Sequence, residues 1–377
     1  MAKKHNKRGG VVLPIILFVL IFLIATLFMP FSFAPKAKAK NEVYEYVMRD
    51  VFKNKDPLVT KIAMLGAHDA FSHNISFTSF ADSNDKNIVS SKLAGAIAKG
   101  LAVRTSKSQS VGAKELLYSG VRYLDVRITK INGRYYTSHI YVSDTLESYV
   151  KEVVDFLDSH KGEFIIFDIQ HFRTENGSNY ELEDSEYIDL YNELDRIKGE
   201  SGKSLLDYVF YDSSVDDIDT LTYTKVTNNR ESGGVIILSK SYETKDAYYR
   251  DKDASYKRNY YYTIRSFWHE TNTNKSMLEG IEYEYNYLNE HNYEGILVVN
   301  QAQKTALIAS TKIITSLFEW SLLDMANNFN RVLVKDEARF KRWLNKMPIF
   351  MVDNATSMKG KFNTLANKYI LEYNESL

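Results

Sequence analysis

The sequence predicts an α/β protein with a distorted or incompletely closed TIM-type (β/α) barrel, preceded by an N-terminal apolar helix. Three observations predict this class. Short apolar, β-branched runs recur and are typical of buried strands. Amphipathic helical patterns separate several of them, which indicates a parallel sheet. No Gly-x-Gly-x-x-Gly follows the first run, so a barrel is favoured over a nucleotide-binding sheet. The runs lie at 59–65, 121–128, 164–169, 235–238, 260–264, 296–299 and 349–352.

The N-terminus carries the clearest compositional signal. Four basic residues precede an almost purely apolar stretch at 11–34, which is long enough for a spanning helix of about 20 residues. We expect residues 1–35 to form a signal-anchor or signal peptide, 36–44 a tether, and 45–377 the catalytic barrel. The basic end would stay inside, which predicts an extracytoplasmic domain anchored to the cell membrane, or a secreted one if the small residues at 34–39 are cleaved.

Composition narrows the chemistry. Lys+Arg and Asp+Glu both number 48, so no net charge favours a nucleic-acid partner. The chain has no cysteine, which excludes thiol nucleophiles, Cys-bound zinc and disulfides. The oligomeric state is left open by these patterns.

Helical periodicity is predicted in five segments, and one long polar insertion is predicted after the first strand. Asp144 and Glu147 form a plausible capping pair at the start of one helix. The insertion covers residues 76–112, which are rich in Ser, Lys and Asn. The helices are expected near 43–52, 146–157, 187–197, 305–329 and 336–344.

Charged side chains follow three of the predicted strands. Side chains at the carboxyl ends of parallel barrel strands converge on one mouth, where the active sites of such barrels lie. His139 follows a strand and an Asn-Gly hairpin turn, so it can fold back to the same mouth. The residues at the strand ends are His68, Asp69, Asp125, Arg127 and Asp353.

Two histidines with separate carboxylate partners suit transfer at a phosphodiester. A neutral imidazole takes a proton from the attacking hydroxyl, and a protonated one gives a proton to the leaving oxygen. Asp69 and Asp353 are the candidate carboxylates that fix the tautomers of His68 and His139. Arg127, with Asp125 as its partner, can bind two phosphate oxygens with its planar guanidinium.

These motifs resemble the X-type catalytic domain of bacterial phosphatidylinositol-specific phospholipases C. The similarity is carried by residues 62–70, by 120–127, and by His139 followed by a helix and the run at 164–166. It implies a phosphodiester cleavage of phosphatidylinositol in which a neighbouring inositol hydroxyl attacks the phosphorus, giving diacylglycerol and a cyclic inositol phosphate.

The resemblance also implies a role for each residue. His68 is the general base and His139 the general acid; Asp69 supports the acid and Asp353 the base. Arg127 binds phosphate, with Asp125 beside it. Relatives that use a metal carry acidic ligands near this second-strand position, where a fixed cation would repel a divalent ion. We therefore expect no metal and no cofactor.

The head-group side departs from the family pattern. Inositol-binding members place a lysine near the end of the third strand, where this chain has Gln170, and an arginine after the fourth, where it has Lys240. We expect these two residues, with Tyr262 and Trp268, to contact substrate, the aromatic rings by stacking on a sugar or meeting lipid.

Three functions remain open from the residues. The partner is a phospholipid or another phosphodiester, so the chain is a phosphatidylinositol lyase or a phosphodiesterase acting on another head group or a wall polymer. The third alternative is an inactive, membrane-tethered binding module. Analysis of the reaction products distinguishes the two enzymatic alternatives. If the chain is a binding module, His68→Ala and His139→Ala should leave ligand binding intact and cause no loss of turnover.

Overall fold

The computed structural model describes residues 44–85, 95–210, 218–240, 264–306 and 319–377, with a few isolated positions nearer the N-terminus. The predicted N-terminal helix and tether lie almost entirely outside these residues. In the described part of the chain, no helix combines the length and apolar character that crossing a bilayer requires.

Seven parallel strands form the central sheet, in the order β7-β5-β2-β1-β10-β9-β8. Among the described residues no pairing joins β7 to β8, the two strands at the ends of this order. This curved sheet agrees with the predicted distorted or incompletely closed barrel. The strands are β1 (Met64–Ala67), β2 (Val121–Ile131), β5 (Phe164–Thr174), β7 (Gly234–Ser239), β8 (Ile264–Phe267), β9 (Leu297–Gln301) and β10 (Ile349–Val352).

The two faces of the sheet pack in separate apolar clusters. Inner-face residues such as Met64, Tyr123 and Met351 pack with side chains from 44–62 and 218–226. Alternate residues, such as Leu65 and Leu124, point outward and pack against the helices. Because successive strand side chains point to opposite faces, residues two apart form layers that rise through the barrel to its mouth.

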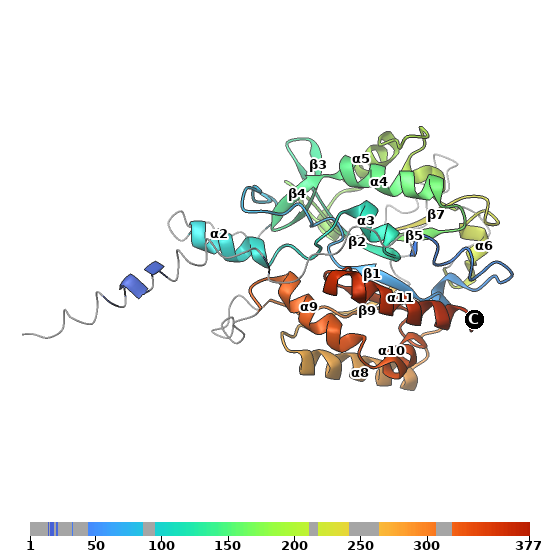
Figure 1. Cartoon of the computed structure of the whole chain (residues 1–377). Helices are drawn as coiled ribbons and strands as arrows, with labels where there is room; N and C mark the ends of the chain where they lie inside the picture. The colour runs from blue at the N-terminus through green and yellow to red at the C-terminus, as the bar shows by residue number, and fades with distance from the viewer. Residues whose placement is uncertain are drawn as a thin grey trace, which may run out of the picture.

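Helices cover the outer face. Figure 1 shows α3, α4 and α5 around one half of the barrel and α8 to α11 around the other half, with α2 standing away from the barrel. The helices are α2 (Gly95–Arg104), α3 (Ala113–Tyr118), α4 (Leu146–Ser159), α5 (Asp184–Arg196), α6 (Tyr223–Val226), α8 (Asn274–Glu290), α9 (Leu322–Leu333), α10 (Glu337–Leu344) and α11 (Lys361–Asn374).

A β-hairpin extends β2 beyond the barrel. The antiparallel strands β3 (Arg134–His139) and β4 (Tyr141–Thr145) follow it, and the short β6 (Gly177–Ser178) pairs with the end of β5. Asn132 and Gly133 both have positive φ, at 50° and 76°, as a two-residue type I′ turn requires. The predicted hairpin is thus confirmed, and it returns His139 toward the barrel.

Several predicted boundaries were wrong. Residues 44–54 form turns in place of the first helix, and 59–61 form a 3-10 turn before β1 begins at Met64. The cap of α4 is Thr145, whose hydroxyl accepts from the Ser148 N–H, rather than Asp144. Inside the predicted loop insertion, 95–104 form α2. Most of the predicted strand at 260–264 and much of the helix at 305–329 lie outside the described residues.

Candidate active site

His68 stands directly after β1, at the centre of the mouth. Its backbone N–H donates to the Val352 carbonyl at 3.0 Å, which continues the β1–β10 ladder by one residue. The Nδ1 atom lies 2.7 Å from Oδ1 of Asp353, at the end of β10. Because an ionised carboxylate only accepts, Nδ1 carries the proton in this contact. On the other side of the ring, Nε2 lies 2.8 Å from Nη2 of Arg127.

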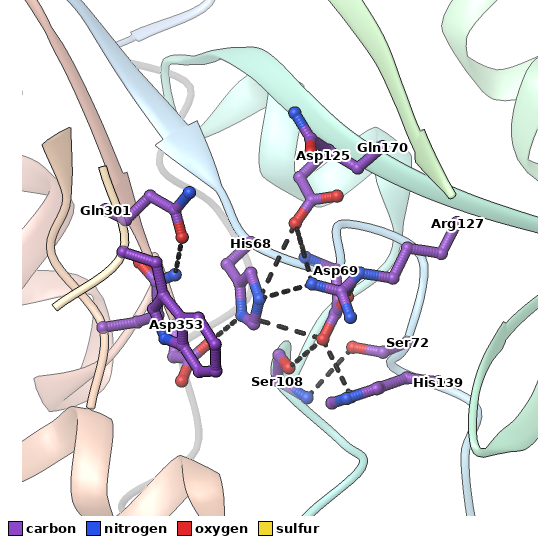
Figure 2. A network of polar contacts seen from close by, with 12 residues as sticks. His68, Asp69, Ser72, Ser108, Asp125, Arg127, His139, Gln170, Gln301 and Asp353 are labelled. Carbon is purple, nitrogen blue, oxygen red and sulfur yellow. Dashed lines mark hydrogen bonds and ion pairs between the residues drawn. The ribbon is translucent and has the colours of Figure 1, made fainter. Parts of the chain in front are cut away.

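Asp69 is the residue that joins the two histidines to the arginine. Its Oδ2 lies 2.8 Å from Nδ1 of His139 and 3.6 Å from Nδ1 of His68. Its Oδ1 contacts Nε of Arg127. Asp69 has a φ of 42°, a left-handed conformation that aspartate tolerates better than most residues. Figure 2 shows its carboxylate between His68 and His139.

The two imidazoles face the same space. Their ring centroids lie 6.3 Å apart and their planes cross at 76°. With Nδ1 of His139 bound to Asp69, its Nε2 is the nitrogen left for a ligand. The arrangement therefore offers two ring nitrogens from two different elements to one small group, with a guanidinium beside them (Figure 2).

Arg127 contacts the carboxylate of Asp125, on its own strand β2, as well as that of Asp69, in the turn after β1. Its Nη2 lies 3.5 Å from Oδ2 of Asp125, which also accepts the backbone N–H of Asp69 at 3.1 Å. The β2–β5 register shifts between Val126 and Arg127, and this irregularity lies at the point where Arg127 leaves the ladder. The Arg127 side chain keeps 16% of its surface exposed, which leaves a cation accessible from the mouth.

The charged groups of the site shift one another's pKa values. Burial lowers the pKa of His68, but the carboxylates of Asp69 and Asp353 outweigh it and raise that pKa to about 9. Burial opposes ionisation of Asp69 too, yet Arg127 and the two histidines hold the pKa of Asp69 well below its usual range. Burial raises the pKa of Asp353, although His68 partly offsets it.

The raised pKa of His68 favours the protonated ring, whereas its contact with Arg127 requires the neutral ring. The 2.8 Å contact needs a free lone pair on Nε2, because a proton there would face the Arg127 donor. We take the neutral ring as the state drawn in Figure 2, and the raised pKa as showing how readily that ring accepts a proton. Protonated His68 requires Arg127 to move away.

Three of these side chains could in principle hold a cation. Ligand atoms of His68, Asp69 and Asp125 lie within 4.8 Å of one another. However, Arg127 contacts His68, Asp69 and Asp125 with the same guanidinium. The fixed positive charge occupies the position that a divalent ion would need, so the residues present fit a metal poorly.

The segment 106–109 packs against the site residues and was not predicted to do so. Ser108 Oγ donates to Oδ2 of Asp69 at 2.9 Å, and the Ser106 carbonyl lies 3.0 Å from Nδ1 of His139. Gln109 Nε2 donates to the carbonyls of His68 and Val352 at 2.8 and 3.0 Å. These residues lie in a polar run that reads as an exposed loop, and nothing in its composition shows that Ser106, Ser108 and Gln109 are buried.

A second polar cluster lies beside Asp125. It contains the predicted residues Gln170 and Lys240, together with Asp168 and Tyr123, which were not predicted. Asp168 of β5 is fully buried and is the register partner of Asp125. Its Oδ2 accepts from the Tyr123 hydroxyl and from Nε2 of Gln170. Burial raises the pKa of Asp168 to about 7. Lys240, at the end of β7, interacts electrostatically with both Asp168 and Asp125, and burial lowers its pKa.

The structure brings together all six residues predicted to be catalytic. The residues predicted to bind substrate lie farther from this cluster. Gln170 lies on β5 and donates to Asp168, and Lys240 follows β7 and interacts electrostatically with Asp168 and Asp125. Trp268 follows β8, keeps 51% of its surface exposed, and donates its indole N–H to Thr305 at 2.9 Å. Tyr262 lies outside the described residues.

No family model matches the chain. Curated relatives match over limited stretches. The chain is similar to the variant-surface-glycoprotein phospholipase C of Trypanosoma brucei brucei, with 31% identity over 132 residues, which cover 32% of this chain and 37% of that protein. It is also similar to PI-PLC X domain-containing protein 3 of Danio rerio, with 28% identity over 120 residues, which cover 30% and 37%. The chain thus matches little more than a third of the length of either relative.

Solved structures match over most of the chain. A variant of the phosphatidylinositol-specific phospholipase C from Staphylococcus aureus aligns with a TM-score of 0.56 and 14% identity, covering 87% of this chain and 97% of that one. The enzyme of the same name from Listeria monocytogenes aligns with a TM-score of 0.52 and 14% identity, covering 84% and 93%. At this identity the likeness establishes a shared fold, which agrees with the distorted barrel described above.

Proposed function

We propose that the protein is a phosphodiesterase that cleaves phosphatidylinositol-type lipids into diacylglycerol and a cyclic inositol phosphate. The observation that carries the proposal is the placement of His68 and His139 on either side of the Asp69–Arg127 ion pair. The similarity to named phospholipases C, in sequence over limited stretches and in fold over most of the chain, supports the same reaction class.

In the proposed reaction, the ring hydroxyl next to the phosphate attacks phosphorus. His68 accepts the hydroxyl proton on Nε2, while Asp353 holds the proton on Nδ1 and stabilises the imidazolium. The new O–P bond closes the cyclic phosphate as the bond from phosphorus to the glycerol oxygen breaks. His139 gives its Nε2 proton to that oxygen, and Asp69 stabilises His139 in its charged form.

Arg127 stabilises the charge on the non-bridging oxygens. Its guanidinium already contacts His68 and Asp69, so a bound phosphate would take over part of these contacts and free Nε2 of His68 for the attacking hydroxyl. Removing one such donor from an active site typically costs about 10² to 10³ in rate. Because the cation is part of the chain, the proposed reaction needs no metal.

The site of action is also a proposal. The basic and apolar composition of residues 1–35 fits an export signal or anchor, which would hold the barrel at the outer side of the cell membrane. A barrel tethered there would meet its lipid substrate without a second membrane-binding domain. Fractionation of cells that express the full chain, followed by protease treatment of intact cells, tests this placement.

The function is tested by incubating the full chain with vesicles that contain phosphatidylinositol and identifying the products by mass spectrometry. A cyclic inositol phosphate supports the proposal. Turnover of another phosphodiester without this product would favour the second candidate, for which the observation is the replacement of the family lysine by Gln170. Ligand binding without turnover of any diester would indicate an inactive binding module.

A further inference from the structure

The turn that follows His139 has a strained backbone. Ile140 has a φ of 64°, a left-handed conformation that is rare for a β-branched residue. Such a conformation persists only where the surrounding structure holds it in place. His139 is the last residue of β3, in the hairpin that extends beyond the seven parallel strands. The position of the proposed acid therefore depends on what fixes this hairpin.

Asp82 contacts the chain on both sides of His139. Its backbone N–H donates to the carbonyl of Ile140 at 2.8 Å. Its carboxylate oxygen Oδ2 accepts from the hydroxyl of Ser138 at 2.6 Å. Ser138 and Ile140 are the two chain neighbours of His139, so one residue restrains the backbone immediately before and immediately after the imidazole.

The segment that carries Asp82 runs beside β4. Ala81 and Tyr141 form an antiparallel bridge, and the Val142 N–H donates to the Phe80 carbonyl at 2.9 Å. Backbone pairing of this kind fixes a position but does not depend on the type of residue. The carboxylate of Asp82 adds the one contact in this pairing that requires an acidic or amide side chain.

The same carboxylate joins the hairpin to the barrel wall. Its Oδ1 accepts from the hydroxyl of Thr129 at 2.9 Å and from the Asn84 N–H at 3.0 Å. Thr129 lies on β2, two residues beyond Arg127. Nη1 of Arg173, on β5, lies 3.9 Å from Oδ2 of Asp82. Asp82 is fully buried, and a buried carboxylate is tolerated only with partners of this kind, which here come from β2, β3 and β5.

We propose that Asp82 is a positioning residue for the general acid: it holds the β3–β4 turn so that Nε2 of His139 points at the leaving oxygen of the substrate. This inference rests on the proposed function. The contact with Asp69 fixes Nδ1 of the ring, whereas the direction of Nε2 also depends on where the backbone places the ring. A displacement of about 1 Å at a reacting group can cost about 10² in rate.

The expected effect is confined to one chemical step. His139 is proposed to act only on the leaving oxygen, so loss of the Asp82 contacts should lower kcat and leave KM, which reflects phosphate binding by Arg127, nearly unchanged. A substrate with a nitrophenyl leaving group needs little protonation, so it should keep most of its rate. A purely structural role would instead lower the active fraction and reduce the rates on both substrates equally.

The experiment measures kcat and KM of Ser138→Ala and Asp82→Ala on phosphatidylinositol and on an inositol nitrophenyl phosphodiester. The ratio of the two kcat values should fall about tenfold in Ser138→Ala, and further in Asp82→Ala, which also loses the contact with Thr129. Ser204→Ala is the matched control. Its hydroxyl is also buried and donates to carboxylates at 2.9 and 3.2 Å, next to the amino end of β7 and opposite the mouth. Its ratio should equal that of the wild type.

Ser138→Ala decides between the outcomes, because it removes a single hydroxyl and does not depend on the folding of Asp82→Ala. An unchanged ratio in Ser138→Ala overturns the inference, and so does an equal loss of rate on both substrates. Arg173→Lys is a second control. It keeps a cation beside Asp82 and leaves both contacts with the hairpin, so its ratio should also equal that of the wild type.

The inference and the proposed function fail in different ways. Absence of turnover of both substrates by the wild-type chain would overturn the proposed function. Hydrogen exchange of the backbone amides at 134–145 then decides whether Asp82 fixes the hairpin that carries His139. Faster exchange there in Ser138→Ala than in Ser204→Ala supports the positioning role, and equal exchange overturns it.

Discussion

Asp353 holds Nδ1 of His68 at 2.7 Å while Arg127 approaches Nε2 of the same ring at 2.8 Å. The carboxylate fixes which nitrogen carries the proton, and the guanidinium marks the nitrogen that is free to accept one. This relationship gives His68 the features of a general base before any substrate is present. It also links the protonation of His68 to the position of Arg127.

The first prediction concerns the pH dependence of Asp353→Asn. Asp353 is one of the two carboxylates that raise the pKa of His68 to about 9, and only the neutral ring can act as base. In the wild type, kcat/KM should therefore fall as pH drops below about 9. Removing the carboxylate lowers the pKa of His68, so this limb should move to lower pH while the maximal rate falls about 10² to 10⁴-fold.

The matched control is Asp189→Asn, which makes the same change in an exposed pair with Lys130. Its pH profile should overlay that of the wild type. A limb that stays in place in Asp353→Asn would show that His68 is not the group whose titration is observed.

The second prediction separates the acid from the base. His139→Ala and His68→Ala should each reduce kcat by about 10² to 10⁴ on phosphatidylinositol. A substrate whose leaving group is a nitrophenol needs little protonation, so it should restore much of the lost rate in His139→Ala and little in His68→Ala. Rates of the two variants on both substrates make the measurement. Equal recovery in both variants would contradict the assigned roles.

The third prediction concerns Arg127 and metals. Arg127→Lys keeps the charge but loses the planar pair of donors, so kcat/KM should fall about 10² to 10³-fold. Wild-type turnover should be unchanged by a chelator, because Arg127 supplies the cation. Arg173→Lys is the control, since that arginine pairs with Asp82 and Asp85 away from the proposed chemistry. Inhibition by chelator that added divalent ion reverses would refute this assignment.

Much of the barrel was predictable because its signals are local. A run such as 164–169 is apolar on both faces, and this pattern alone indicates a strand buried between a barrel interior and a layer of helices. The turn at Asn132 and Gly133 was predictable for the same reason, since it depends on two adjacent residues. The site was predictable because the carboxyl ends of parallel barrel strands converge, and this rule predicts that His68, Arg127 and Asp353 lie close together.

The unpredicted parts depend on contacts between distant residues. Ser108 reads as a loop residue because its burial against Asp69 comes from the return of the chain after α2. Asp168 reads as part of a strand end, and only the register with Asp125 reveals that two carboxyls lie side by side. Residues 44–54 carry a helical pattern, but their apolar side chains close the floor of the barrel and are held in turns there.

The fourth prediction concerns stability at the opposite end of the barrel from the site. Glu163, just before β5, and Arg122, near the start of β2, form a fully buried ion pair at 2.8 Å. Oε1 of Glu163 also accepts the backbone N–H groups of Met48 and Arg49, both at 2.9 Å. Glu163→Ala would leave a buried guanidinium without its partner, which typically costs about 3 to 5 kcal/mol.

Urea unfolding of the full chain measures this loss. Glu279→Ala is the control, because its pair with Lys275 is exposed and contributes little. The folded fraction of Glu163→Ala should keep the wild-type pH profile, since Glu163 touches none of the catalytic groups. A variant as stable as the wild type would mean that water or a rearranged backbone replaces the carboxylate. The 44–54 segment would then not depend on Glu163 for its position under the barrel.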